Sequence, residues 1–195
     1  MNLAIIILAA GASQRFGESN KLLALVAGRP MIEHVIVATK DVPAAYRFAV
    51  TGEADAKLLD LLTRYDVTAI PNPNVRQGQG SSIAAGAQAA LHSGAEAALI
   101  VLGDMPFVTG KYLRMICETL QDNEAVVSEF AGRHMPPMLF GKAALHRLAN
   151  LSPEGSGKDV LRSPYKALPL PTDMARDIDT RETLAKYKSS LGDSS

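Results

Sequence analysis

Short apolar runs alternate along the chain with longer stretches in which apolar residues recur every three or four positions. The runs have the length of buried strands, and the periodic stretches have the spacing of helices with one buried face. Strands are predicted at 3–8, 46–51, 67–70, 97–102 and 125–130, with an edge strand between prolines at 167–170. Helices are predicted after Pro30, at 53–65, from Ser81 or Ser82 to 91, at 109–120 and at 142–148. This alternation is typical of a three-layer α/β fold with a mostly parallel central sheet.

The helical spacing also predicts where individual side chains lie. The leucines of the helix at 53–65 are expected to face inward, and they are Leu58, Leu59, Leu61 and Leu62. His34 shares the inner face of the helix after Pro30 and is interpreted as a partly buried scaffold residue. Cys117 lies within the pattern at 109–120, which favours a small core residue.

The charge balance limits the possible partners. Lys plus Arg and Asp plus Glu number 20 each, and this zero net charge argues against nucleic acid as a main partner. No apolar run approaches the length of about 20 residues that spans a membrane, so no membrane anchor is expected. The first residues enter a strand without a basic leader, so no signal peptide is expected. A single cysteine excludes an internal disulfide and favours the cytoplasm. We expect one domain over 1–188 and a polar tail at 189–195.

A glycine-containing loop follows the first predicted strand, at 8–21. Glycine lets a ligand approach the backbone closely, and successive N–H groups in such a turn favour anions. Arg15 and Lys21 add the positive charge that a polyphosphate requires. The loop is neither a P-loop nor a dinucleotide fingerprint. It predicts a site for a nucleoside triphosphate, and the alternative is an ordinary α/β turn with solvated cations.

The loop at 71–82 contains two prolines and two glycines and precedes an alanine-rich helix. Ser81 or Ser82 is predicted to cap that helix, whose N-terminal N–H groups would form a second anion or polar-ligand site. The alternative is an ordinary capped loop without a ligand.

Carboxylates mark two further segments. Asp104 follows the predicted strand at 97–102, where open α/β sheets bind ligands, although it also suits a position flanking a helix. Asp177 and Asp179 would point the same way if their segment is extended. Asp179 could instead cap a short final helix together with Thr180.

The orders L-A-A-G-x-S-x-R-x-G…K-L-L at 8–23 and L-G-D-x-P at 102–106 resemble the two signatures of the MobA-like nucleotidyltransferases. The chain is most similar to the molybdenum cofactor cytidylyltransferase branch. The resemblance implies a Rossmann-like nucleotidyltransferase fold and a catalytic set of Arg15, Lys21 and Asp104. It implies that Arg15 binds the β- and γ-phosphates and Lys21 the α-phosphate. It further implies that Asp104 and Asp179 hold Mg²⁺, with Asp177 as the second choice.

The resemblance also implies the remaining contacts of the nucleotide. The first loop would contribute Leu8, Ala9, Ala10, Gly11 and Ser13, and the second loop Asn72, Gly78, Ser81 and Ser82. In the second loop, Gln79 replaces the family's methionine and Gly80 its first serine. Cytidylyl members typically carry alanine at the position of Ala10, where guanylyl members usually have a second glycine.

The acceptor side is implied by 132–140, which corresponds to a family stretch G-R-x-G-H-P-x-L-F. Arg133, His134 and Pro137 are assigned to it, while Met135 and Pro136 replace the family's glycine and histidine. At 154–161 the likeness is only in outline. Asp159 stands where the family has an arginine, and Lys158 could supply a nearby charge.

This resemblance implies that CMP passes from CTP to a phosphate-bearing acceptor, molybdopterin, with release of pyrophosphate. A molybdoenzyme or its chaperone is the expected protein partner. The alternatives are GMP transfer from GTP, a sugar-phosphate or polyol-phosphate acceptor, and a nucleotide-binding maturation partner without turnover. A nicotinamide-dependent oxidoreductase is disfavoured, because the dinucleotide fingerprint is missing.

Overall fold

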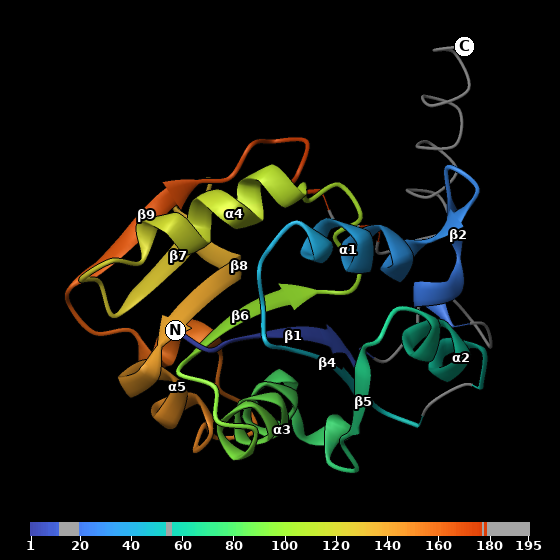
Figure 1. Ribbon diagram of the computed structural model, residues 1–195, viewed down its shortest axis with the longest axis horizontal. Coiled ribbons are helices and arrows are strands. Elements are labelled where there is room, and N and C mark those ends of the chain that lie inside the picture. The colour runs from blue at the N-terminus through green and yellow to red at the C-terminus, as the bar shows by residue number, and fades with distance from the viewer. Residues whose placement is uncertain (12–19, 54–55, 177, 179–195) are drawn as a thin grey trace.

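The computed structural model describes residues 1–11, 20–53, 56–176 and 178. A seven-stranded sheet with the order β5-β4-β1-β6-β8-β7-β9 forms its centre (Figure 1). The strands are β1 (Leu3–Ala9), β4 (Tyr46–Thr51), β5 (Thr68–Pro71), β6 (Ala97–Leu102), β7 (Ala125–Phe130), β8 (Arg133–Gly141) and β9 (Tyr165–Pro169). Strands β5, β4, β1 and β6 are parallel neighbours, whereas β8 runs antiparallel to both β6 and β7. A separate hairpin joins β2 (Leu25–Val26) and β3 (Arg29–Pro30).

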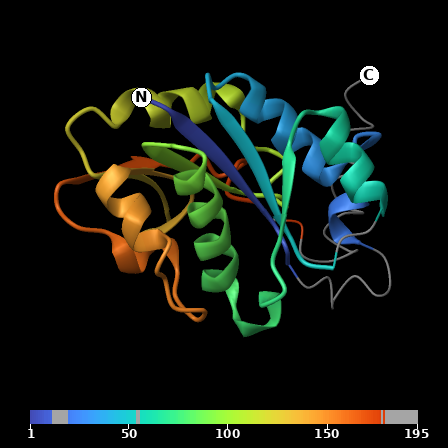
Figure 2. The same ribbon diagram turned by 60° about the horizontal axis from the view of Figure 1, so that its bottom comes forward.

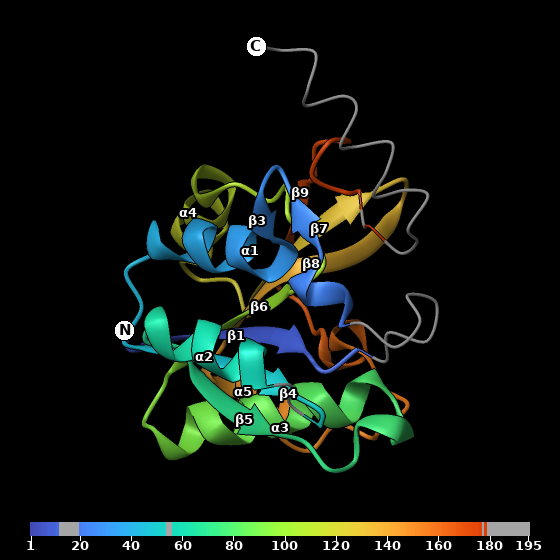
Figure 3. The same cartoon turned by 90° about the vertical axis from the view of Figure 1, so that its right-hand side faces the viewer.

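Helices cover both faces of this sheet. They are α1 (Met31–Lys40), α2 (Ala56–Arg64), α3 (Gln79–His92), α4 (Gly110–Thr119) and α5 (Lys142–Leu148). Most buried apolar side chains of α1 and those of α2 and α4 belong to one core cluster, and those of α3 and α5 belong to another. Figure 3 shows α1 and α4 on one side of the sheet and α3 on the other, and Figure 2 shows α3 and α5 lying side by side. The described residues therefore form the predicted three-layer α/β fold.

Strand β1 shows how the sequence produces these layers. All seven of its residues are buried, and successive side chains enter opposite core clusters. Ile5 and Ile7 pack beneath α1, whereas Ile6 and Leu8 pack against α3. A strand covered on both faces has no polar positions, which explains its continuous apolar run.

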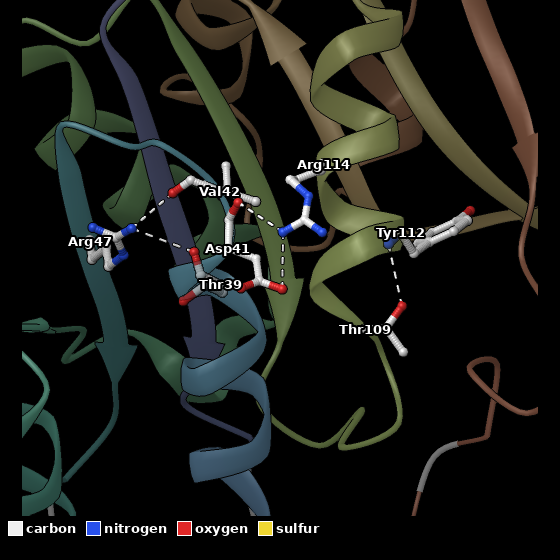
Figure 4. A network of polar contacts seen from close by, with 7 residues as sticks. All are labelled: Thr39, Asp41, Val42, Arg47, Thr109, Tyr112 and Arg114. Carbon is white, nitrogen blue, oxygen red and sulfur yellow. Dashed lines mark hydrogen bonds and ion pairs between the residues drawn. The ribbon is translucent and has the colours of Figure 1, made fainter.

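A polar network fixes the end of α1 (Figure 4). Arg47 Nη2 of β4 donates to the Val42 carbonyl at 2.9 Å and to that of Thr39 at 3.5 Å. Arg114 of α4 pairs with Asp41 at 3.1 Å, and the Thr109 hydroxyl accepts a bond from the Tyr112 N–H at the start of α4. The contacts of Arg47 and Arg114 hold this end of α1 against β4 and α4, whereas the Thr109 bond caps α4. The opposite end of α1 directly follows the β2–β3 hairpin.

Several expectations need correction. Leu59 was expected to face inward but is exposed, because Leu58, Leu61 and Leu62 already form the buried stripe of α2. Strand β8 was not predicted, since consecutive prolines interrupt its pattern. In its register Met135 pairs with Ser128 and Met138 with Val127, so both prolines fall in a gap of the ladder.

Other expectations are confirmed. β9 lies at a sheet edge, as its flanking prolines predicted. His34 is a scaffold residue, since its Nε2 lies 2.7 Å from the Val26 carbonyl oxygen. Cys117 packs partly buried against the core. Within the described ranges, none of the helices combines the length and apolar character needed to cross a bilayer.

Candidate active site

The site begins where β1 and β6 end side by side. Leu8 pairs with Leu102, and the Gly103 N–H donates to the Leu8 carbonyl at 3.0 Å. The two chains therefore leave the sheet together, so that Gly11 and Asp104 emerge at the same edge. This is the edge at which parallel α/β sheets bind ligands.

A cleft of about 440 Å³ opens at this edge. Six residues predicted to bind nucleotide line it, and they are Leu8, Ala10, Gly11, Gly78, Ser82 and Asp104. Four lining residues were missed by the sequence analysis, and they are Val75, Arg76, Gln79 and Leu102. Ala9 was predicted here too, but its side chain enters the core cluster on the other face of the sheet. Arg76 was detectable as the one cation of the loop at 71–82.

Lys21 contacts Asp104, which lines this cleft. The Lys21 Nζ atom lies 3.0 Å from Asp104 Oδ2, and the two side chains are 13% and 28% exposed. Lys21 begins the 3₁₀ helix Lys21–Leu23, which Asn20 caps by accepting a bond from the Leu22 N–H. The buried Leu22 anchors this turn to the core. The sequence separates the two charges by 83 positions, and the fold brings them into direct contact.

Helix α3 enters the cleft with its N-terminus. Its N-cap is Gly78, at φ +130°, and not Ser81 or Ser82 as predicted. The Ser81 hydroxyl instead donates back to the Gly78 carbonyl at 2.7 Å, because the helix begins before either serine. At Gly80, a Cβ would collide with the Ser152 carbonyl, so glycine is required there. The Ser81 N–H donates to the Gly78 carbonyl at 3.2 Å, whereas the N–H groups of Gln79 and Gly80 precede this first bond of the helix and suit an anion or a polar ligand.

Asn72 supports this helix start from beneath. It is 4% exposed, and its Nδ2 donates to the hydroxyls of Ser81 and Ser82, each at 3.0 Å. Its Oδ1 accepts a bond from the Asn74 N–H at 2.9 Å. Asn72 and Ser81 therefore hold the loop together, whereas Ser82 lines the cleft itself.

Ile178 is the residue of the C-terminal motif that the structure describes. Ile178 is fully buried with Val26 and Met31, and Phe107 packs against this cluster. Phe107 follows Asp104 closely in sequence, so Ile178 is fixed near the segment that leaves β6. The predicted residues Ser13, Arg15, Asp177, Asp179 and Thr180 lie outside the described residues.

The residues assigned to the acceptor separate into different environments. His134 lines a second pocket of about 130 Å³, and its Nε2 lies 3.5 Å from Glu129 Oε2. Arg133 is exposed at the start of β8. The carbonyl of Pro137 accepts a bond from the buried Ser128 hydroxyl at 2.7 Å, and it is Pro136 that lines the pocket.

The main cleft offers one ligand suited to a hard divalent cation. Asp104 is the one carboxylate among the described residues that line it. Within the described ranges, no group of three His, Cys, Asp or Glu side chains could hold a metal ion without further ligands. Magnesium in nucleotide sites is commonly held by one or two carboxylates together with substrate phosphates and water. One cleft carboxylate beside a phosphate site therefore meets that requirement in part, and Asp179 remains the predicted second ligand.

Comparison with known proteins identifies the family and the fold. The sequence model of the MobA-like NTP transferase domain matches residues 5–169. A "Bifunctional protein GlmU" from Acidiphilium cryptum is 35% identical over 144 residues, which cover 73% of this chain and 31% of the relative. The chain thus spans about a third of the length of that relative.

Three solved structures share the fold. Rv0371c of Mycobacterium tuberculosis, in complex with manganese, has a TM-score of 0.75 at 21% identity and covers 97% of this chain and 100% of its own. A CMP:2-keto-3-deoxy-manno-octonic acid synthetase with CTP has a TM-score of 0.75 at 14% identity, covering 99% of both chains. The molybdopterin-guanine dinucleotide biosynthesis protein A of Archaeoglobus fulgidus has a TM-score of 0.72 at 17% identity, covering 97% of this chain and 99% of its own.

Proposed function

The chain belongs to the MobA-like NTP transferase family, and from that membership we propose that it transfers CMP from CTP to molybdopterin and releases pyrophosphate. The observation that carries the proposal is the contact of Lys21 with Asp104, which lines the cleft beside Gly11. A cation for the phosphates and a carboxylate for a metal ion thus lie 3.0 Å apart, which is hydrogen-bonding distance. Binding alone requires no such carboxylate, so the pair favours an enzyme over a nucleotide-binding maturation partner.

The reaction asks little covalent chemistry of the protein. An oxygen of the acceptor phosphate attacks the α-phosphorus in line, a new P–O bond forms, and the bond to the β-phosphate breaks. The electron pair of that bond leaves with pyrophosphate. A phosphate monoester is largely ionised at neutral pH, so no side chain needs to remove a proton.

The residues of the cleft act by position and charge. Gly11 and the first turn of α3 offer N–H groups to the triphosphate, and Lys21 neutralises charge at the α-phosphate. Asp104, with Asp179 as the predicted second ligand, would hold Mg²⁺. When bound, that cation neutralises charge on the phosphate oxygens. Alignment of the reacting groups and preorganised charge supply most of the rate.

The choice of CTP rests on Ala10, which lines the cleft where guanylyl members usually carry glycine. The choice of molybdopterin rests on the motifs at 8–23 and 102–106. GMP transfer to the same acceptor is the second candidate, because the fold is shared with a protein named for molybdopterin-guanine dinucleotide biosynthesis. A molybdoenzyme or its chaperone would then receive the product, in the cytoplasm.

The test is incubation of the purified protein with molybdopterin, Mg²⁺ and either CTP or GTP. Pyrophosphate release is followed continuously, and the dinucleotide product is identified from its mass by mass spectrometry. We expect release with CTP that requires molybdopterin and stops when the cation is chelated. Faster release with GTP would contradict CMP transfer and favour GMP transfer to molybdopterin. Absence of release with either nucleotide would contradict the enzyme and favour the maturation partner.

A further inference from the structure

The second pocket adjoins the main cleft. Both cavities are lined by Leu8 at the end of β1 and by Gln79 at the start of α3. The second pocket continues from there beneath β8, where His134, Met135, Pro136 and Met138 form one wall. A molecule that fills it would therefore lie beside the nucleotide, which is where an acceptor must lie for in-line attack.

More than half of the residues that line this pocket are apolar, and they are Leu8, Ile83, Ile100, Met135, Pro136 and Met138. The others are Gln79, His134, Ser156, Gly157 and Lys158. Hydroxyl groups buried against such walls would lose their hydrogen bonds to water without replacement, which costs about 1–3 kcal/mol for each group. The pocket volume of about 130 Å³ is close to that of an apolar cavity of about 150 Å³ that binds benzene. Size and polarity both favour a ring-sized, weakly hydrated group over a polyol.

The lining of the same pocket includes a positive charge. Lys158 is the one lysine or arginine among the described residues that line it. Its position is set by the 3₁₀ helix Gly157–Val160, in which Asp159 accepts bonds from the Ser156 N–H at 2.7 Å and the Ser156 hydroxyl at 3.1 Å. Asp159 is thus occupied in a capping box, while Lys158 is exposed and forms no ion pair with the described part of the chain.

We propose that Lys158 binds the phosphate of the acceptor and that the adjoining pocket takes a ring-sized, weakly hydrated part of the same molecule. The inference rests on the proposed nucleotidyl transfer and adds to it the residue and the surface that select the acceptor. A sugar phosphate is rejected, because its hydroxyls would face the side chains of Met135, Pro136 and Met138.

Methyl NMR of the whole protein tests this pocket directly. Methionine methyl groups are labelled with ¹³C, and the signals of Met135 and Met138 are assigned by substitution with leucine. The protein is titrated with phenyl phosphate or with glucose 1-phosphate, in the presence of the α,β-methylene analogue of CTP, which cannot release pyrophosphate. Met115, exposed on α4, is the internal control.

We expect phenyl phosphate to shift the signals of Met135 and Met138 in a saturable manner and to leave that of Met115 unchanged. Glucose 1-phosphate should leave all three signals unchanged. Lys158→Gln should raise the Kd for phenyl phosphate about tenfold, the effect of losing about 1.4 kcal/mol. The matched change Lys111→Gln, at an exposed position of α4, should leave this Kd unchanged.

Equal or larger shifts with glucose 1-phosphate would overturn the proposal. So would the absence of shifts with phenyl phosphate, or an unchanged Kd in Lys158→Gln. Pyrophosphate release from CTP and molybdopterin separates this failure from that of the proposed function. Release without methionine shifts contradicts the pocket alone, whereas methionine shifts without release contradict nucleotidyl transfer.

Discussion

Substitution of Asp104 by asparagine separates the catalytic from the structural role of the pair with Lys21. The change removes one negative charge and keeps the size of the side chain and an oxygen that can accept a bond from Lys21 Nζ. Because the fold of the surrounding strands is unaltered, effects on rate and on stability can be compared in the same variant.

The structure sets the expected cost in stability. The Lys21 Nζ and Asp104 Oδ2 atoms lie 3.0 Å apart, and the two side chains are 13% and 28% exposed. The pair therefore lies between a surface pair, worth about 0–1 kcal/mol, and a buried pair, whose disruption costs about 3–5 kcal/mol. Since asparagine retains a hydrogen bond, we expect the free energy of unfolding to fall by about 1 kcal/mol. Loss of a preorganised group that stabilises transition-state charge should lower kcat about 10²–10³-fold, or about 3–4 kcal/mol.

Both quantities can be measured on one preparation. Initial rates of pyrophosphate release give kcat, and urea unfolding gives the stability. Asp41→Asn is the matched control, because Asp41 pairs with Arg114 at 3.1 Å with side chains 53% and 44% exposed. That control should lose at most about 0.5 kcal/mol and keep its activity. A kcat for Asp104→Asn within threefold of the unaltered protein would refute the assignment of Asp104 to the reaction.

Three further predictions test the scaffold. Ser128→Ala should lower the free energy of unfolding by about 1–3 kcal/mol in a urea titration, because it removes the buried link between the Tyr112 hydroxyl and the Pro137 carbonyl; Ser93→Ala, at a helix end, is the milder control. Burial raises the pKa of Cys117 from 9.0 to about 11, so at pH 8 its thiol should react with a disulfide reagent about 100-fold more slowly in the folded protein than in urea. Equal rates would contradict its burial. The hydrogen bond from Arg147 lowers the pKa of Glu124 below 4.5. The stability from this pair is therefore complete above pH 4.5 and is lost as the pH falls through the lowered pKa, so Glu124→Gln should be less stable at pH 7 and should approach the unaltered protein in acid. A deficit that persists unchanged in acid would contradict this.

The parts of the fold that the sequence predicted best are strands with a buried apolar centre. β4, β6 and β7 have the predicted bounds, because each contains at least three consecutive buried apolar residues. β8 was missed, since Pro136 and Pro137 read as a loop and nothing local shows that the ladder resumes at Met138. Leu59 was predicted to be buried but is exposed. An apolar residue beside the buried stripe of a helix shows the same local sequence pattern as a residue within the stripe.

The candidate site likewise contains features that the sequence predicts and features that it does not. Gly11 and Asp104 could be predicted to meet, because each follows a buried strand and those strands are neighbours. The roles of Asn72 and Ser81 could not, since they depend on where α3 begins, and that is fixed by the distant segment around Ser152 packing on Gly80. The part played by Lys158 likewise depends on Asp159 being engaged with Ser156, a contact that spacing alone does not reveal.

The most direct measurement is a crystal structure of the full chain with the α,β-methylene analogue of CTP and manganese, whose anomalous signal locates the cation. The account predicts the triphosphate between Gly11 and the start of α3, Lys21 on the α-phosphate, and the cation on Asp104. A triphosphate bound elsewhere on the molecule, or a cation that Asp104 does not touch, would contradict it.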